Sequence, residues 1–231
     1  MRKSVFSAIS IFAISICFGQ DKLENNQILI SLLYSNSDWT IIKKTNDSVN
    51  ISIKELDNSD LYAIKVDKTI NIEPEQITDV IMDVKNYNSF LSNTKYLKSQ
   101  VIEQNNTDLI GYQYIRINLL FFDDREYFFR MSRKGIADQD STTMCFWKLL
   151  EPFDNNRTIK SNEDITYIEY GAGIWKSEHI SPGKNKISYS LYMDPGGSIP
   201  DFIVDKINEQ SILGLFQDAV NEAFRRKNAN S

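Results

Sequence analysis

Cysteine and histidine are almost absent from this chain of 231 residues, which contains two cysteines and one histidine. His179 alone lacks the partners that a His-rich metal site or a serine–histidine–aspartate triad requires. Because Cys17 lies in the N-terminal leader, Cys145 has no second cysteine with which to form an intramolecular disulfide. We therefore predict no metal, no cofactor and no catalytic residue, and we interpret Cys145 as a buried apolar side chain.

Positive charge is also scarce. The chain has 26 Lys and Arg residues against 31 Asp and Glu residues, which gives a net charge of −5. No basic stripe of the kind that binds nucleic acid is present, so we predict no nucleic-acid partner. No Pro-, Gly- or Ser-rich linker divides the chain either, and we predict one domain over residues 20–231.

Long apolar runs are confined to the N-terminus. Arg2 and Lys3 precede an apolar run over residues 5–18, which is too short to span a bilayer comfortably. We predict a secretory signal peptide over residues 1–19 and export to the periplasm or the medium of a Gram-negative bacterium. Lipidation at Cys17 is the alternative to soluble export.

Strand-like segments fill most of the remaining chain. They are rich in β-branched and aromatic residues and are separated by turns of Asn, Asp and Ser. Helical spacing of apolar residues predicts a short helix over residues 26–34 and another over residues 73–83. The nine predicted strands cover residues 39–44, 49–56, 61–70, 94–104, 109–118, 124–136, 142–151, 165–178 and 186–194.

The longest predicted helix follows the turn Asp194-Pro-Gly-Gly-Ser198. Ser198 can cap its first turn, and Pro200 suits a position where a missing N–H costs nothing. Its apolar residues occupy two faces that change near Gly214, which makes this glycine a candidate hinge. A helix of about 25 residues is ~37 Å long, enough to lie across a curved sheet. The order of elements predicts an α+β fold in which an antiparallel sheet of about nine strands wraps around this helix and leaves an internal hydrophobic cavity.

Four segments give the chain a family resemblance. They are Trp39, Asp124-Arg-Glu-Tyr-Phe128, Gly173-Ile-Trp175, and Tyr189 to Pro200 running into the terminal helix. With them the chain resembles START domains, the StAR-related lipid-transfer family of the Bet v 1-like superfamily. The resemblance implies a helix-grip fold whose tunnel holds one lipid or other hydrophobic molecule, with the C-terminal helix as its lid.

The candidate ligand-binding residues are mostly large and apolar. In one register of strand 109–118, Tyr112, Tyr114 and Arg116 face inward; the register in which Ile115 and Ile117 face the core stays open. We assign Leu120, Phe121, Phe122 and Gly214 to a lid or to membrane contact. The full set of candidate ligand-binding residues is Tyr112, Tyr114, Arg116, Tyr127, Phe129, Met131, Trp147, Trp175, Tyr189, Leu191, Met193, Ile203 and Ile207.

The resulting expectation is a monomer that binds, and transfers, a lipid or other hydrophobic small molecule without catalysis and with transient membrane contact. Two alternatives stay open. One is an aromatase/cyclase-like enzyme on the same scaffold that positions its substrate with Tyr112, Tyr114 and Arg116. The other is an interaction module whose aromatic side chains fill the cavity.

Overall fold

The structure is a computed structural model. It describes residues 26–57, 59–92, 95–117, 122–135, 142–151, 165–196 and 201–229, and for residues 135 and 201–210 the backbone alone.

Within these residues ten strands make one sheet, and nine of them follow an antiparallel path in the order β1-β2-β3-β10-β9-β7-β6-β5-β4. The tenth, β8, pairs in parallel with β6. The strands are β1 (Thr40–Lys44), β2 (Asn50–Lys54), β3 (Ala63–Ile70), β4 (Leu97–Gln104), β5 (Asp108–Ile115), β6 (Asp124–Gly135), β7 (Thr142–Leu149), β8 (Ile165–Tyr167), β9 (Tyr170–Ser181) and β10 (Lys184–Asp194).

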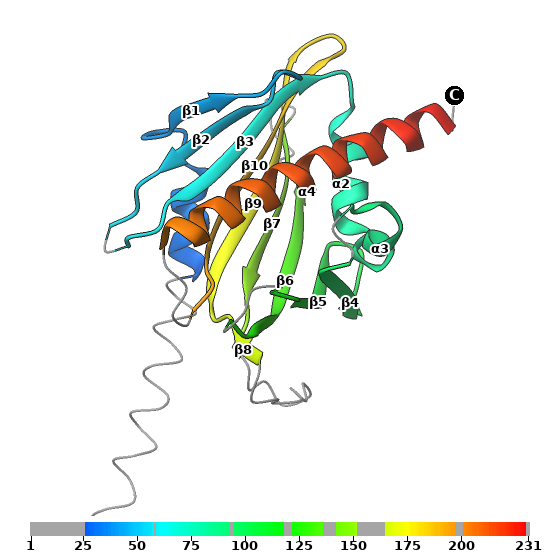
Figure 1. Ribbon diagram of the computed structural model, residues 1–231. Helices are drawn as coiled ribbons and strands as arrows, with labels where there is room; N and C mark the ends of the chain where they lie inside the picture. Colours follow the sequence, from blue (N-terminus) through cyan, green and yellow to red (C-terminus); the bar gives the residue numbers. More distant parts are fainter. Residues whose placement is uncertain are drawn as a thin grey trace, which may run out of the picture.

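Helices flank this sheet on both faces. The chain is helical over residues 26–34, and the later helices are α2 (Pro74–Met82), the 3-10 turn η1 (Val84–Asn86), α3 (Tyr87–Phe90) and α4 (Asp201–Ala229). At the start of α2 the Glu73 amide donates to Gln76 Oε1 at 3.0 Å, and Pro74 occupies the first turn. The long α4 crosses the curved sheet, with α2 and α3 beside its C-terminal part (Figure 1).

The inner face of the sheet, defined as the face that α4 covers, carries large apolar side chains. Met131 is the direct cross-strand neighbour of Trp147, and Trp175 is that of Tyr189. From α4, the fully buried Phe216 packs into the same cluster. Because side chains alternate along a strand, these residues share one face of the sheet.

The outer face is covered by the helix at residues 26–34, drawn in blue behind the strands (Figure 1). The Asn26 side chain anchors this helix because its Oδ1 accepts the Gly171 amide at 3.0 Å. The apolar side chains that meet here form a second cluster of Leu29, Ile30, Leu33, Leu61, Ala63, Ala172, Ile174 and Tyr192.

Charged side chains fix the C-terminal part of α4. Arg226 pairs with Asp83 at 2.7 Å and with the buried Glu222 at 2.7 Å, and Arg225 donates to Glu222 at 2.6 Å. These hydrogen bonds, that of Arg225 first, lower the pKa of Glu222 to about 2. The C-terminal part of α4 is thereby tied to the residue that follows α2.

The predicted helix-grip architecture is confirmed, but the single strand expected over residues 165–178 is wrong. The segment is divided between β8 and β9, because β8 pairs with β6 whereas β9 lies between β7 and β10. At the break the Ile168 amide donates to the Glu126 carbonyl oxygen at 2.9 Å. The predicted signal peptide lies outside the described residues. Among the helices described, none is both long and apolar enough to cross a bilayer.

Candidate functional site: an apolar cavity beneath helix α4

A cavity of about 550 Å³ lies between the inner face of the sheet and α4. This volume falls in the range of small-molecule sites, roughly 300–1,000 Å³. No carboxylate is among its described lining residues, and two arginines are, Arg116 and Arg125. The remainder of the lining is mostly aliphatic and aromatic, so the cavity suits a hydrophobic molecule.

Nine of the predicted ligand-binding residues line this cavity. They come from β6, β7, β9 and β10 and from the residue that follows β5, and they are Arg116, Tyr127, Phe129, Met131, Trp147, Trp175, Tyr189, Leu191 and Met193. Ile203 and Ile207 lie in α4, but their side chains are outside the described part of the structure. Strand alternation thus identified most of the wall that the sheet provides.

Of the two registers left open, the structure has the one in which Ile115 and Ile117 line the cavity, so the ligand-binding assignment of Tyr112 and Tyr114 is wrong. On β5 it is Gln113 and Ile115 that line the cavity. Tyr112 lies on the outer face, where its ring packs 5.2 Å from that of Phe128. The two tyrosine hydroxyls donate to carboxylates that begin β6: Tyr112 to Glu126 at 2.7 Å and Tyr114 to Asp124. The pKa of Tyr112 is raised, chiefly by desolvation. The pKa of Tyr114 is also raised, chiefly by its hydrogen bond to Asp124.

Arg116 lines the cavity although the two tyrosines before it do not. The last residue of β5 is Ile115, so the alternation of side chains between the two faces of that strand does not extend to Arg116. Its amide donates to the Tyr96 carbonyl oxygen at 2.7 Å, which holds it beside the segment before β4. Arg116 is exposed and therefore places a cation at the solvent edge of the cavity.

Arg125 joins the cavity wall to the turn that precedes α4. It is 3 % exposed, and its guanidinium donates to the carbonyl oxygens of Pro195 at 2.7 Å and Gly196 at 3.1 Å. Gly196 has φ +62°, a conformation that glycine adopts without strain. Burial lowers the pKa of the Arg125 guanidinium. The side chain thus positions the turn from which α4 starts.

An aromatic stack forms one wall of the cavity. The rings of Trp175 and Tyr189 lie nearly parallel with their centroids 4.3 Å apart. The ring of Phe216 from α4 also stacks on Trp175, with the two centroids 5.7 Å apart. On the same face, the Trp147 indole lies over Gly173, where a Cβ atom would come within 2.5 Å of Nε1. The absence of a side chain at Gly173 is what admits this ring.

Several lining residues were missed by the sequence analysis. Gln113 is the cross-strand partner of Tyr127. Because paired residues share a face of the sheet, the inward orientation of Tyr127 would have placed Gln113 in the cavity, but the sequence does not reveal which residues pair. Others come from helices, loops and strand ends, where no alternation applies. The missed residues are Tyr87, Tyr96, Leu97, Gln113, Arg125, Ile168, Pro195, Ser211, Ile212 and Leu215, whereas Ile115 and Ile117 belong to the register that the sequence left open.

The residues predicted to form a lid are only partly described. Leu120 and Phe121 lie outside the described residues. Phe122 is described, and it packs against the outer-face cluster rather than lining the cavity, which corrects its assignment. Gly214 lies within the continuous helix α4, and a Cβ atom there would meet nothing within 4 Å. Its role as a hinge stays a prediction.

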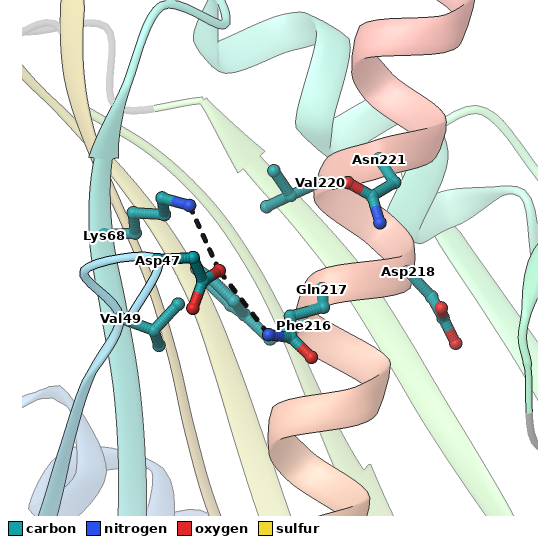
Figure 2. Close-up of a pocket in the computed structure, with 8 residues that line it drawn as sticks. All are labelled: Asp47, Val49, Lys68, Phe216, Gln217, Asp218, Val220 and Asn221. Carbon is teal, nitrogen blue, oxygen red and sulfur yellow. Dashed lines mark hydrogen bonds and ion pairs between the residues drawn. The ribbon is translucent and has the colours of Figure 1, made fainter. Parts of the chain in front are cut away.

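A second, polar cleft of about 320 Å³ lies on another side of α4, between this helix and the turn before β2. Figure 2 shows Asp47 of that turn joined to Lys68 at 3.3 Å and to Gln217 at 3.5 Å. The hydrogen bond from Thr45 is the first cause of the lowered pKa of Asp47. Phe216 lines this cleft and also stacks on Trp175 of the apolar cavity, so its ring stands between the two hollows. Because Asp47 pairs with Lys68 and Asp218 accepts hydrogen bonds from Ser92, the charged groups of the cleft already have partners, and the apolar cavity is the better candidate site.

The comparisons with known proteins find similarity in fold but not in sequence. No family model matches the sequence, and no curated protein is similar to it in sequence. Solved structures are similar in fold. A STAR-related lipid transfer protein from Xanthomonas axonopodis has a TM-score of 0.68 at 12% identity, over 81% of this chain and 99% of that one. Human StAR-related lipid transfer protein 5 has a TM-score of 0.67 at 12% identity, over 90% and 97%.

The chain has a START-like fold. Human STARD10 extends the likeness, with a TM-score of 0.64 at 15% identity over 88% of this chain and 82% of that one. The predicted START resemblance is therefore confirmed for the fold. At such low identity the START-like fold fixes the arrangement of sheet and helix, and the chemistry of the cavity follows from this chain's own residues.

Proposed function

We propose that the protein binds one lipid or other hydrophobic small molecule in the cavity beneath α4, without catalysing a reaction on it. The observation that carries the proposal is the apolar cavity itself, about 550 Å³ with no carboxylate among its described lining residues. Burial of apolar ligand surface is favourable by about 25 cal/mol per Å². The similar solved structures from Xanthomonas axonopodis and human are named as lipid transfer proteins, which supports this class of ligand.

Arg116 gives the proposed ligand an orientation. Its exposed guanidinium lies at the edge of a cavity whose interior carries Phe129, Trp147 and other large apolar side chains. A ligand with an apolar body and a polar or anionic head would bury the body and leave the head near Arg116. Arg116→Ala is expected to weaken the binding of such a ligand, and an unchanged affinity would remove Arg116 from the site.

The finer part of the proposal is transfer between membranes. It rests on the apolar residues Leu120 and Phe121 between β5 and β6 and on Gly214 as a hinge of α4. Phe121→Asp is expected to slow lipid exchange between vesicles while the far-ultraviolet circular dichroism spectrum stays unchanged. A normal exchange rate would contradict membrane contact through this segment.

A pair of adjacent substitutions tests the site. Ile115→Trp adds bulk inside the cavity, whereas Tyr114→Trp changes the neighbouring residue on the opposite face of β5. Delipidated protein is incubated with vesicles of phosphatidylethanolamine, phosphatidylglycerol and oleate, and retained lipid is identified by native mass spectrometry. We expect lipid on the wild-type and Tyr114→Trp proteins and about tenfold less on Ile115→Trp. Wild-type protein that retains nothing, or equal retention by both variants, would contradict the proposal.

We also propose that residues 1–19 are a signal peptide and that the protein acts outside the cytoplasm. The basic pair Arg2 and Lys3 before the apolar run over residues 5–18 supports this. Mass spectrometry of the N-terminus of the mature protein tests it. A mature chain that still begins at Met1 would contradict export by cleavage.

A further inference from the structure

The buried tyrosine hydroxyls of the cavity differ in how they use their hydrogen. Tyr87 donates to the Ile81 carbonyl oxygen at 2.5 Å, and Tyr127 donates to Gln113 Oε1. A phenol has one O–H to donate, so in both residues it is already engaged within the protein. These two hydroxyls have no hydrogen left for a ligand.

Tyr189 is different because its hydroxyl is an acceptor. Trp147 Nε1 donates to Tyr189 Oη at 3.1 Å. An indole N–H can only donate, so the phenol oxygen must accept, and its own hydrogen remains available. The described part of the chain supplies no acceptor for that hydrogen. Tyr189 is 4 % exposed, and a buried donor without a partner destabilises the protein unless a ligand accepts its hydrogen.

The surroundings of Tyr189 hold this hydroxyl in place. Its ring stacks on that of Trp175 from the neighbouring strand, with the ring centroids 4.3 Å apart and an angle of 11° between the ring planes. The indole of Trp147, which donates to the phenol oxygen, packs closely against Gly173. Both tryptophans and Tyr189 line the cavity. Burial also raises the pKa of Tyr189, so the phenol keeps its hydrogen at any physiological pH.

We propose that Tyr189 donates a hydrogen bond to an oxygen atom of the bound molecule. The ligand is then not a plain hydrocarbon where it passes Tyr189: it carries an ester, ketone, ether or hydroxyl oxygen on its otherwise apolar body. This inference rests on the proposed function and specifies the ligand class for the same cavity. Two tryptophans position the donor in advance, so little order has to be imposed when the ligand binds.

The test uses two probes of similar length and equal numbers of non-hydrogen atoms, methyl palmitate and nonadecane, which differ in the ester oxygens. Both are loaded in equal amounts into phosphatidylcholine vesicles, and the protein is separated and its bound probes are quantified by mass spectrometry. The wild-type protein is expected to retain the ester in preference to the alkane. Tyr189→Phe is expected to reduce that preference about 3–10-fold, as the loss of one neutral hydrogen bond would, without changing alkane retention.

Tyr192→Phe is the matched control, because it removes a buried hydroxyl from the same strand β10 on the outer face of the sheet, where Tyr192 is hydrogen-bonded to Ser59 and does not line the cavity. Its ester preference is expected to equal that of the wild-type protein. A second measurement needs no substitution: methyl palmitate labelled with carbon-13 at its carbonyl is bound to wild-type protein, and its infrared C=O stretch is expected at the lower frequency of a hydrogen-bonded ester.

The outcomes separate this inference from the proposed function. If the wild-type protein retains neither probe and no vesicle lipid, the proposed function and this inference are both overturned. If the protein retains lipid but Tyr189→Phe keeps the full ester preference, only the role of Tyr189 is overturned. The same conclusion follows if the labelled carbonyl absorbs at the frequency of a free ester.

Discussion

Two helices cover the two faces of one sheet, and a cavity of about 550 Å³ lies beneath one of them, α4. On the outer face, the helix at residues 26–34 packs on a cluster that includes the fully buried Ala63 and Ala172 as well as Ile174 and Tyr192. On the inner face, α4 meets the rings of Trp147, Trp175 and Tyr189 and closes over about 550 Å³. The cavity between α4 and these rings is the candidate binding site.

The largest expected effect is on the inner face, from Phe216→Ala. The Phe216 side chain is fully buried and stacks on Trp175 between the cavity and the polar cleft. Its loss should join the two hollows and lower the free energy of unfolding by about 3–5 kcal/mol in urea titrations. Gln217→Ala on the same helix is the control and should change it by less than about 0.5 kcal/mol. Equal losses for both would argue against Phe216 as the separating ring.

Leu29→Ala tests the outer face. Leu29 is fully buried in the outer-face cluster, so its truncation should lower the free energy of unfolding by about 3 kcal/mol. Lipid retention per folded molecule should stay at the wild-type level, because the sheet separates this cluster from the cavity. Ile28→Ala, at a side chain 51% exposed, is the control for a surface change in the same helix. Loss of lipid by folded Leu29→Ala protein would break the distinction between the faces.

Gly173→Ala should disturb the inner face more mildly. The new Cβ atom would come within 2.5 Å of Trp147 Nε1, so the indole must move from its place beside Tyr189. We expect about 1–3 kcal/mol lower stability and a shifted tryptophan fluorescence spectrum. Gly214→Ala is the control, because a Cβ atom there meets nothing within 4 Å, and it should stabilise α4 by about 0.5–1 kcal/mol. An unshifted spectrum in Gly173→Ala would contradict the close packing of Trp147.

Low pH should destabilise the packing of α4 more than that of the helix at residues 26–34, since charged pairs fix α4 whereas the uncharged Asn26 anchors the other helix. The pKa of Glu222 is lowered from 4.5 to about 2 in the folded protein. A depressed carboxyl pKa stabilises the fold above the unfolded value, and that stability is lost as the pH falls from about 4.5 through about 2. The loss should be on the order of 1–2 kcal/mol, because Arg225 is largely exposed.

The pH measurement compares wild-type and Glu222→Gln proteins by urea unfolding between pH 6 and pH 2.5. Because the variant has no carboxyl group at this position, the difference in stability between the two proteins should shrink as the pH falls through this window. A difference that stays constant across the window would show that ionised Glu222 does not stabilise the C-terminal part of α4.

Much of this fold could be predicted from the sequence because its signals are local. Alternation along Tyr127, Phe129 and Met131 placed these residues on one face, and the turn at Asp194 marked the start of the long helix. The same reasoning left two registers open for β5, where both sides carry large side chains. Pairing with β6 decided that case, because Glu126 and Asp124 accept the hydroxyls of Tyr112 and Tyr114 on the outer face.

The sequence by itself determined the order of most elements, the inward face of β6, β7, β9 and β10 and the apolar character of the site, since each depends on residues close together in the chain. The tertiary structure alone decided which side of β5 faces the cavity, the division of residues 165–178 into two strands, and the meeting of Trp147 with Tyr189. These features depend on partners 10 to 42 residues apart, and such pairing is set by sheet register and packing rather than by local preference.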